Sequence, residues 1–262
     1  MTRLNQTLLR LLLIFIISGI YPYSSAFAQV NRDTLKVLFV GNSYTYVQNL
    51  PQVVSIISDS TKTKLVTRKS TVGGAYLREH WYGKRGLKTK DIITNGHFNI
   101  VILQENSMGT IEQKDSTIKY AKLLCEFIKA SGAKPYLYMT WAREKVPQYQ
   151  EEIERVYSKI AKENGAVLVP VGKAWQLAMK LRPSIGLYDP DGSHPSSLGA
   201  VLSANVFVGA LTGEVPASIP LWYGITDING ESVQILSINN LDAVFFQKIA
   251  EQTLTESGLL KL

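Results

Sequence analysis

Between residues 35 and 172, apolar residues fall in short continuous runs, and most runs are followed by a turn and then by a stretch with helical periodicity. Runs of this kind are typical of strands that are buried on both faces of a sheet. They predict strands over residues 35–41, 97–104, 134–141 and 166–172, and the more polar segment 64–72 is predicted to form a fifth strand.

Helical patterns alternate with these runs. The clearest one covers residues 115–132, where Ile118, Ala121, Leu124 and Ile128 recur on one helical face. Further helices are predicted at about 49–59, 147–165, 172–182 and 196–211, and the last 50 residues predict a strand over 231–238 and a closing helix over 240–254. Because strands alternate with helices, the pattern predicts a parallel sheet that is covered on both faces.

The first 28 residues have a different character. Arg3 and Arg10 precede the apolar run Leu11–Ile20, and the small-residue pattern Ala26-Phe27-Ala28 follows. This order predicts a signal peptide over residues 1–28 that is cut before Gln29, so that residues 29–262 form one secreted or periplasmic domain. The alternative is a membrane anchor, but the apolar run is shorter than the roughly 20 residues that a span needs.

Composition limits the classes of protein further. The sequence is 45% hydrophobic and 19% charged, with a formal net charge of +7, which is not typical of a disordered or fibrous chain. Its basic residues are scattered, so no nucleic-acid partner is predicted. The single cysteine, Cys125, excludes an internal disulfide, and nothing in the sequence indicates an oligomeric state.

Unusual turns follow four of the predicted strands. Ser43 follows the first strand within Gly-Asn-Ser, and the later ends carry Gly73-Gly74, Gln104-Glu105-Asn106 and Thr140-Trp141. In open α/β sheets, sites form beyond the carboxyl ends of the strands. These four turns are therefore expected to meet at one edge of the sheet, where Ser43 is either a turn former or a nucleophile.

A serine nucleophile needs a base, and the chain has three histidines. His80 is most simply a surface or packing residue, and His97 precedes the third strand at the opposite edge. His194 lies in the loop Asp-Pro-Asp-Gly-Ser-His-Pro, three residues after Asp191, so one loop carries a base and an acid that could orient it. Asp189 is the substitute acid, and an exposed loop histidine without chemistry is the alternative.

Four short motifs resemble those of the SGNH hydrolases, which are part of the GDSL esterase and lipase group. They are Gly41-Asn42-Ser43, Gly74 (with Gly73 as the alternative) in "STVGGAYL", Asn106 in "LQENS", and Asp191-Gly192-Ser193-His194. Each motif is weak alone, but the four occur in the family's order and spacing. The resemblance therefore extends over most of the chain after the signal peptide.

The resemblance implies a flavodoxin-like, three-layer α/β/α sandwich with a mainly parallel five-stranded sheet. It also implies that Ser43 attacks an ester, that His194 takes its proton and that Asp191 orients His194. The oxyanion hole would consist of the backbone N–H groups of Ser43 and Gly74 and the side-chain amide of Asn106. No metal or other cofactor is expected.

The chain departs from the usual motifs at Asn42, Gln104 and Ser107, where the family usually has aspartate, glycine and aspartate. Aromatic and charged residues near the strand ends suggest a small-molecule or polysaccharide ester as substrate, most simply an acetylated carbohydrate. The expected substrate contacts are Tyr44, Gln104, Trp141 and Arg143. The alternatives are a lipase or thioesterase and a non-catalytic glycan-binding domain with the same fold.

Overall fold

The computed structural model describes residues 32–260, so the predicted signal peptide lies outside the described residues. Five strands form one sheet in the order β2-β1-β3-β4-β5, and all four pairings are parallel. The strands are β1 (Asp33–Gly41), β2 (Thr63–Thr71), β3 (Ile100–Leu103), β4 (Lys134–Tyr138) and β5 (Val167–Val169). The predicted parallel five-stranded sheet is therefore confirmed, with β3, β4 and β5 shorter than expected.

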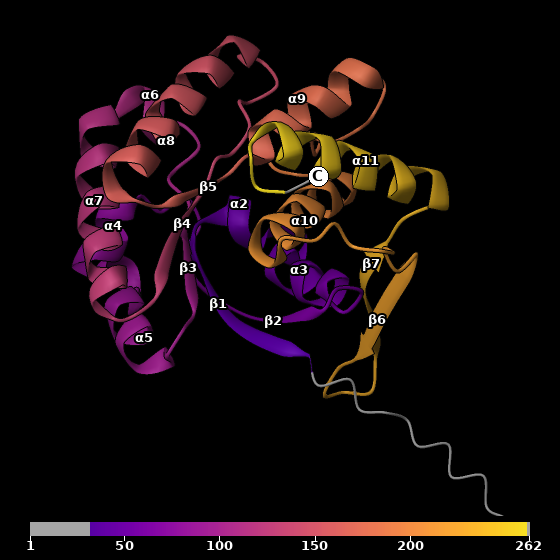
Figure 1. Cartoon of the computed structure of the whole chain (residues 1–262), viewed down its shortest axis with the longest axis horizontal. Helices are drawn as coiled ribbons and strands as arrows, with labels where there is room; N and C mark the ends of the chain where they lie inside the picture. The colour runs from indigo at the N-terminus through magenta and orange to yellow at the C-terminus, as the bar shows by residue number, and fades with distance from the viewer. Residues whose placement is uncertain (1–31, 261–262) are drawn as a thin grey trace, which may run out of the picture. The chain divides into compact units, whose positions relative to one another are not determined.

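Helices cover both faces of this sheet (Figure 1). One face packs against α3 (Leu50–Ser58), α9 (Val171–Leu181), α10 (Ser197–Thr212) and α11 (Asn240–Glu256), and the other against α4 (Leu77–Tyr82), α5 (Thr89–Gly96), α7 (Lys114–Ala130) and α8 (Gln150–Asn164). Alternate residues of β1 serve the two faces: Val37 and Phe39 enter one core, and Leu38 and Val40 enter the other. This is the predicted three-layer α/β/α arrangement.

Short helical segments lie in the connections. They are α2 (Ser43–Tyr46), α6 (Gly109–Glu112) and the three 3-10 turns Val47–Asn49, Lys84–Gly86 and Pro147–Tyr149. The sequence patterns did not predict α5, in which only Thr89 and Ile93 are buried. So few buried positions leave no clear helical stripe.

The strand order places a topological switch at β1. The chain leaves β1 for β2 on one side and then forms β3 on the other side, so the loops after β1 and β3 diverge. A crevice at such a point is where open α/β sheets bind ligands. The carboxyl ends of β1 to β4 lie at this same edge of the sheet, which is called the rim below.

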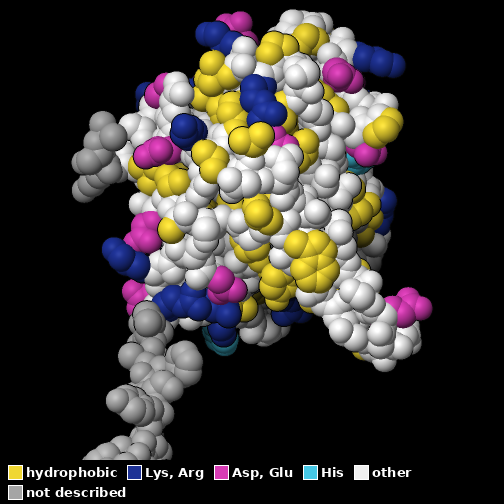
Figure 2. Space-filling view, turned by 90° about the vertical axis from the view of Figure 1, so that its right-hand side faces the viewer, with side chains coloured by type: hydrophobic (Ala, Val, Ile, Leu, Met, Phe, Trp, Pro, Cys, Tyr) yellow, Lys and Arg dark blue, Asp and Glu magenta, His cyan; other side chains and the backbone are white. Residues whose placement is uncertain are grey.

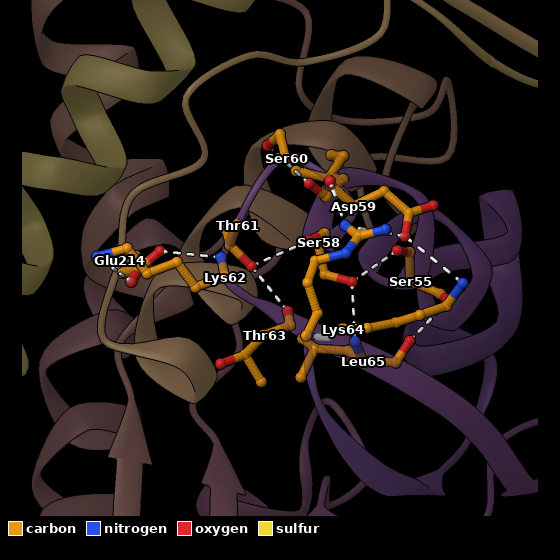
Figure 3. A network of polar contacts seen from close by, with 12 residues as sticks. Ser55, Ser58, Asp59, Ser60, Thr61, Lys62, Thr63, Lys64, Leu65 and Glu214 are labelled. Atoms are coloured by element: carbon orange, nitrogen blue, oxygen red, sulfur yellow. Dashed lines mark hydrogen bonds and ion pairs between the residues drawn. The ribbon is translucent and has the colours of Figure 1, made fainter. Parts of the chain in front are cut away.

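The connection from α3 to β2 is held by polar contacts away from the rim (Figure 3). Ser58 accepts a hydrogen bond from the backbone N–H of Leu65 at 3.0 Å, so the end of α3 is bonded to the start of β2. Glu214, which follows α10, accepts from the backbone N–H of Lys62 at 3.2 Å. These contacts fix the edge strand β2 against the helical layer that carries α3 and α10.

A two-stranded antiparallel hairpin, β6 (Trp222–Thr226) and β7 (Ser232–Ser237), precedes α11. The sequence predicted β7 and α11 but not β6, because β6 is exposed on both faces and shows no alternation. Hydrophobic side chains gather at the centre of the face seen in Figure 2, the side on which the hairpin lies in Figure 1. None of the helices within residues 32–260 is long and apolar enough to cross a membrane.

Candidate active site

Ser43 is the first residue of α2 and is separated from the end of β1 by one residue, Asn42. The side chain of Asn42 caps this helix, because its oxygen accepts the backbone N–H of Tyr44 at 3.1 Å. Its amide nitrogen donates to the carbonyl of Ala75 at 3.0 Å, which bonds the serine turn to the loop after β2. Asparagine therefore holds the turn through both ends of its side chain.

The late loop brings His194 and Asp191 to the same point of the rim. Nε2 of His194 lies 2.8 Å from Oγ of Ser43, and Nδ1 lies 2.5 Å from Oδ2 of Asp191. The other oxygen of Asp191 accepts the backbone N–H groups of Ser193 and His194 at 2.8 and 2.9 Å. The hydrogen bond from His194, with smaller help from these N–H groups, lowers the pKa of Asp191 to about 2. Asp191, and not Asp189, is thus the carboxylate in contact with the imidazole.

The loops after β2 and β3 meet beside Ser43. Gly74 has a φ of +69°, a left-handed conformation that favours glycine. The side-chain amide of Asn106 donates to the carbonyl of Gly74 at 3.0 Å, whereas the carbonyl of Gly73 accepts from Arg85. No hydrogen bond within residues 32–260 uses the backbone N–H of Ser43 or Gly74. The backbone N–H of Gly73 is unused as well within these residues, so it is the contact with Asn106 that favours Gly74 as the donor.

Comparison with known proteins points in the same direction. No protein-family model and no curated protein matches the chain. A solved structure from Slackia heliotrinireducens, described as a "putative SGNH hydrolase", is 26% identical, covers 67% of this chain and 98% of its own, and superposes with a TM-score of 0.56. The chain is similar to the SGNH hydrolases.

Two further solved structures share the fold of this chain. A DUF4886 family protein from Bacteroides uniformis is 17% identical, covers 87% of this chain and 98% of its own, and has a TM-score of 0.68. An acetyl xylan esterase, AlAXEase, is 16% identical, covers 68% of this chain and 100% of its own, and has a TM-score of 0.54.

Gln104 does not reach the surface of the site, so its predicted role as a substrate contact is wrong. Its side chain is fully buried beneath the serine turn, where its oxygen accepts the backbone N–H of Asn42 at 2.9 Å and the hydroxyl of Thr45 at 3.0 Å. A Cβ on Gly41 would lie 2.4 Å from this oxygen, so glycine is required there. The amide of Gln104 thus supports the serine turn from below.

Tyr44 and Trp141 are also buried, and their predicted role as substrate contacts is wrong. They are 2% and 1% exposed, and their rings stack with centroids 4.9 Å apart. The ring of Tyr44 also meets that of His194 edge to face at 5.6 Å, and its hydroxyl lies 2.8 Å from the hydroxyl of Ser193. The indole N–H of Trp141 donates to the carbonyl of Ser193 at 3.0 Å. The two rings therefore form the floor on which the His194 loop rests.

Arg143 is the one expected substrate contact that is exposed. It follows β4, and its guanidinium donates to the hydroxyl of Ser107 at 2.8 Å. Ser107 directly follows Asn106, so this bond joins Arg143 to the loop that carries Asn106. Arg143 also lies close enough to Tyr44 to act on that phenol, although burial has the larger effect and raises the pKa of Tyr44. Arg143 thus places a positive charge beside the site.

Two buried ionisable residues support the rim, and neither had a predicted role in the site. The imidazole of His80 bonds the carbonyl of Gly41 at 3.0 Å and the hydroxyl of Thr89 at 2.7 Å, and burial lowers its pKa to about 4. Glu105 is 2% exposed, and burial raises its pKa to about 7. His80 is therefore a packing residue, as one of the predicted alternatives had it.

The site carries the groups of a serine hydrolase. It has a hydroxyl next to an imidazole, a carboxylate behind the imidazole, and free N–H donors on the other side. Within residues 32–260, no three His, Cys, Asp or Glu side chains gather where they could hold a metal ion. The one cysteine, Cys125, is buried in α7, and burial raises the pKa of its thiol to about 12.

Proposed function

We propose that this serine ester hydrolase removes acetyl groups from carbohydrates through a covalent intermediate on Ser43. The observation that carries the proposal is the continuous contact from Oγ of Ser43 through His194 to Asp191, with separations of 2.8 and 2.5 Å. This order of nucleophile, base and orienting acid is that of a catalytic triad. It explains why the late loop is packed against the serine turn.

In the first half of the reaction, Nε2 of His194 accepts the proton of Ser43 while Oγ attacks the ester carbonyl carbon. Asp191 accepts the hydrogen bond from Nδ1, which selects the tautomer with a free Nε2 and stabilises the imidazolium that forms. Because the pKa of Asp191 is lowered to about 2, this carboxylate is ionised throughout the physiological range. The tetrahedral intermediate then collapses, and His194 donates its proton to the departing alcohol oxygen.

The negative carbonyl oxygen needs donors that already point at it. The backbone N–H groups of Ser43 and Gly74 and the second amide hydrogen of Asn106 are the candidates. Since Asn106 donates only one of its two hydrogens to Gly74, the other remains for the oxyanion. In the second half, His194 accepts a proton from water while the water oxygen attacks the acyl carbon, and His194 then returns the proton to Oγ of Ser43 as the bond from Oγ to the acyl carbon breaks and acetic acid leaves.

The acetyl preference rests on what surrounds the site. The stacked rings of Tyr44 and Trp141 fill the space under His194, so no acyl tunnel opens there. An apolar cavity of about 300 Å³ lies between α3, β2 and the hairpin, but its lining residues, such as Ile56, Val66 and Tyr223, include no member of the triad. The acetyl xylan esterase named above shows that this fold can serve acetylated glycans. Export, as residues 1–28 predict, would bring the enzyme to such polymers.

A chain-length series tests the proposed substrate class. Purified residues 29–262 are assayed on acetate, butyrate and octanoate esters of one alcohol. We expect kcat/KM to fall as the acyl chain lengthens, because the buried rings of Tyr44 and Trp141 fill the space beneath His194. Each methylene that found an apolar groove would gain up to about 0.8 kcal/mol, so a preference for octanoate would favour a lipase or thioesterase instead. Glycan binding without turnover of any ester would favour the non-catalytic alternative.

Arg143 allows a finer test of the substrate. Its exposed guanidinium can pair with a carboxylate on the sugar, such as that of a uronic acid. We expect Arg143→Ala to lower kcat/KM about tenfold on an acidic acetylated glycan and little on a neutral one, since a hydrogen bond to a charged group is worth about 1.5–3 kcal/mol. Arg155→Ala, which changes an exposed arginine on α8, is the control. Equal losses on both glycans would mean that Arg143 does not distinguish acidic from neutral sugars.

A further inference from the structure

Glu105 lies where three loops of the rim meet, and its carboxylate bonds two of them. Oε1 accepts the backbone N–H of Asn106 at 2.6 Å and that of Leu77 at 3.2 Å. Leu77 begins α4, three residues after Gly74. Both N–H groups belong to the segments that carry the outer oxyanion donors, so one carboxylate oxygen joins these segments.

The backbone of Glu105 makes the third connection. Its carbonyl accepts the side-chain amide of Asn42 at 3.4 Å, and its N–H donates to the phenol of Tyr157 at 3.1 Å. The contact with Asn42 reaches the residue that caps the helix of Ser43. The position of Glu105 is therefore coupled to the nucleophile as well as to Gly74 and Asn106.

The carboxyl group is tightly enclosed. A Cβ on Gly109, at the start of α6, would lie 2.6 Å from Cγ of Glu105, so this side chain has no room to move toward α6. The charged and titratable groups that face it are few: Arg78 on α4 and Tyr157 on α8, with the hydroxyl of Thr117 on α7. Because this side chain cannot move aside, a change in its ionisation changes its hydrogen bonds with the N–H groups of Asn106 and Leu77.

We propose that Glu105 is a positioning residue whose carboxylate sets the spacing between the Gly74 and Asn106 donors, so that its ionisation modulates the rate. The inference rests on the proposed function, because these donors act only when an ester oxyanion forms. An ionised carboxylate accepts N–H hydrogen bonds more strongly than a neutral acid does. Since burial raises the pKa of Glu105 to about 7, both forms occur at physiological pH, and the ionised form predominates above it.

The kinetic test uses Glu105→Gln, which keeps the shape and an accepting oxygen but never ionises. Its kcat should be close to that of the wild type at about pH 5.5 and about tenfold lower at about pH 8.5, with KM unchanged, because a charged acceptor strengthens such hydrogen bonds by roughly 1 kcal/mol or more. Glu112→Gln, an exposed acid at the end of α6, is the matched control and should follow the wild type at every pH. A ratio of wild type to Glu105→Gln that does not change with pH would overturn the proposal.

A second readout does not depend on turnover. In the NMR spectrum, the backbone amide protons of Asn106 and Leu77 should shift together as Glu105 ionises, with a midpoint at about pH 7. The shifts should persist in Ser43→Ala and disappear in Glu105→Gln. Amide signals that do not titrate would overturn the role of Glu105, even if the esterase is active. Amide signals that titrate in a protein without esterase activity would contradict the proposed function but leave the bonding by Glu105 in place.

Discussion

The loop after β3 and the loop before α10 each bring a carboxylate to the rim, but in opposite environments. Glu105 is 2% exposed and faces backbone N–H groups, and its pKa is raised to about 7. Asp191 is exposed and bonds the imidazole of His194, and its pKa is lowered to about 2. Both carboxylates accept two backbone N–H groups, so these bonds do not explain the difference: the hydrogen bond with His194 lowers the pKa of Asp191, and burial raises the pKa of Glu105.

The same difference gives the two residues opposite effects on stability. For Asp191, the folded pKa lies below the usual value of about 3.9, so its contribution is present above about pH 4 and is lost as the pH falls toward 2. For Glu105, the folded pKa lies above the usual value, so its contribution is complete below about pH 4 and is lost as the pH rises through about 7.

Of the two carboxylates, Asp191 is expected to give the larger effect on the rate. Asp191→Asn should lower kcat by about 10²–10⁴-fold, because the amide cannot hold His194 in the required tautomer or stabilise its charged form. Asp189→Asn, two residues earlier, is the matched control and should change kcat little. Steady-state kinetics on an acetate ester measures both. The opposite result, with Asp189→Asn inactive and Asp191→Asn active, would move the orienting acid to Asp189.

The next effect concerns the neighbour of Glu105. Asn106→Ala removes the side-chain amide that lies beside Gly74, and it should lower kcat by about 10²–10³-fold with little change in KM. Asn95→Ala, at an exposed position on α5, is the control. A rise in KM at constant kcat would show that Asn106 binds the ground state and does not act on the oxyanion.

The smallest effect is on stability and has an unusual sign. The wild type must ionise a buried acid as the pH rises, whereas Glu105→Gln has no acid to ionise at this position. Between about pH 5 and about pH 8.5, the unfolding free energy of Glu105→Gln should therefore rise by about 3 kcal/mol relative to that of the wild type. Urea denaturation at the two pH values measures this difference. A change of the same size in Asp191→Asn, or one of opposite sign in Glu105→Gln, would break the contrast between the two carboxylates.

Much of the fold could be predicted because its strands are apolar on both faces and its helices carry clear stripes. The predicted strand at 97–104 contains β3 (Ile100–Leu103), in which every residue is buried, and the helix at 115–132 became α7 (Lys114–Ala130). The β6 strand could not be predicted, since neither of its faces is buried. A solvated hairpin leaves no hydrophobic pattern in the sequence.

The sequence predicted which loops form the site, but it did not predict which way all of their side chains point. Ser43, Asp191 and His194 were expected together, and the structure brings them together. Gln104 was expected to face the substrate, yet it points under the serine turn. Its neighbour Glu105 gave no signal beyond its place at a strand end. Whether a residue at the rim faces inward or outward depends on tertiary packing, which sequence spacing alone does not specify.

The central claim is that Ser43 is the nucleophile, and covalent labelling tests it most directly. A fluorophosphonate probe that reacts with activated serines is incubated with wild type, Ser43→Ala and the exposed control Ser197→Ala, and the adduct is located by mass spectrometry. We expect one adduct, on Ser43, in the wild type and in Ser197→Ala. Ser43→Ala should carry none, and its kcat should fall by about 10⁴-fold or more. An adduct on a different residue, or full turnover by Ser43→Ala, would contradict the account.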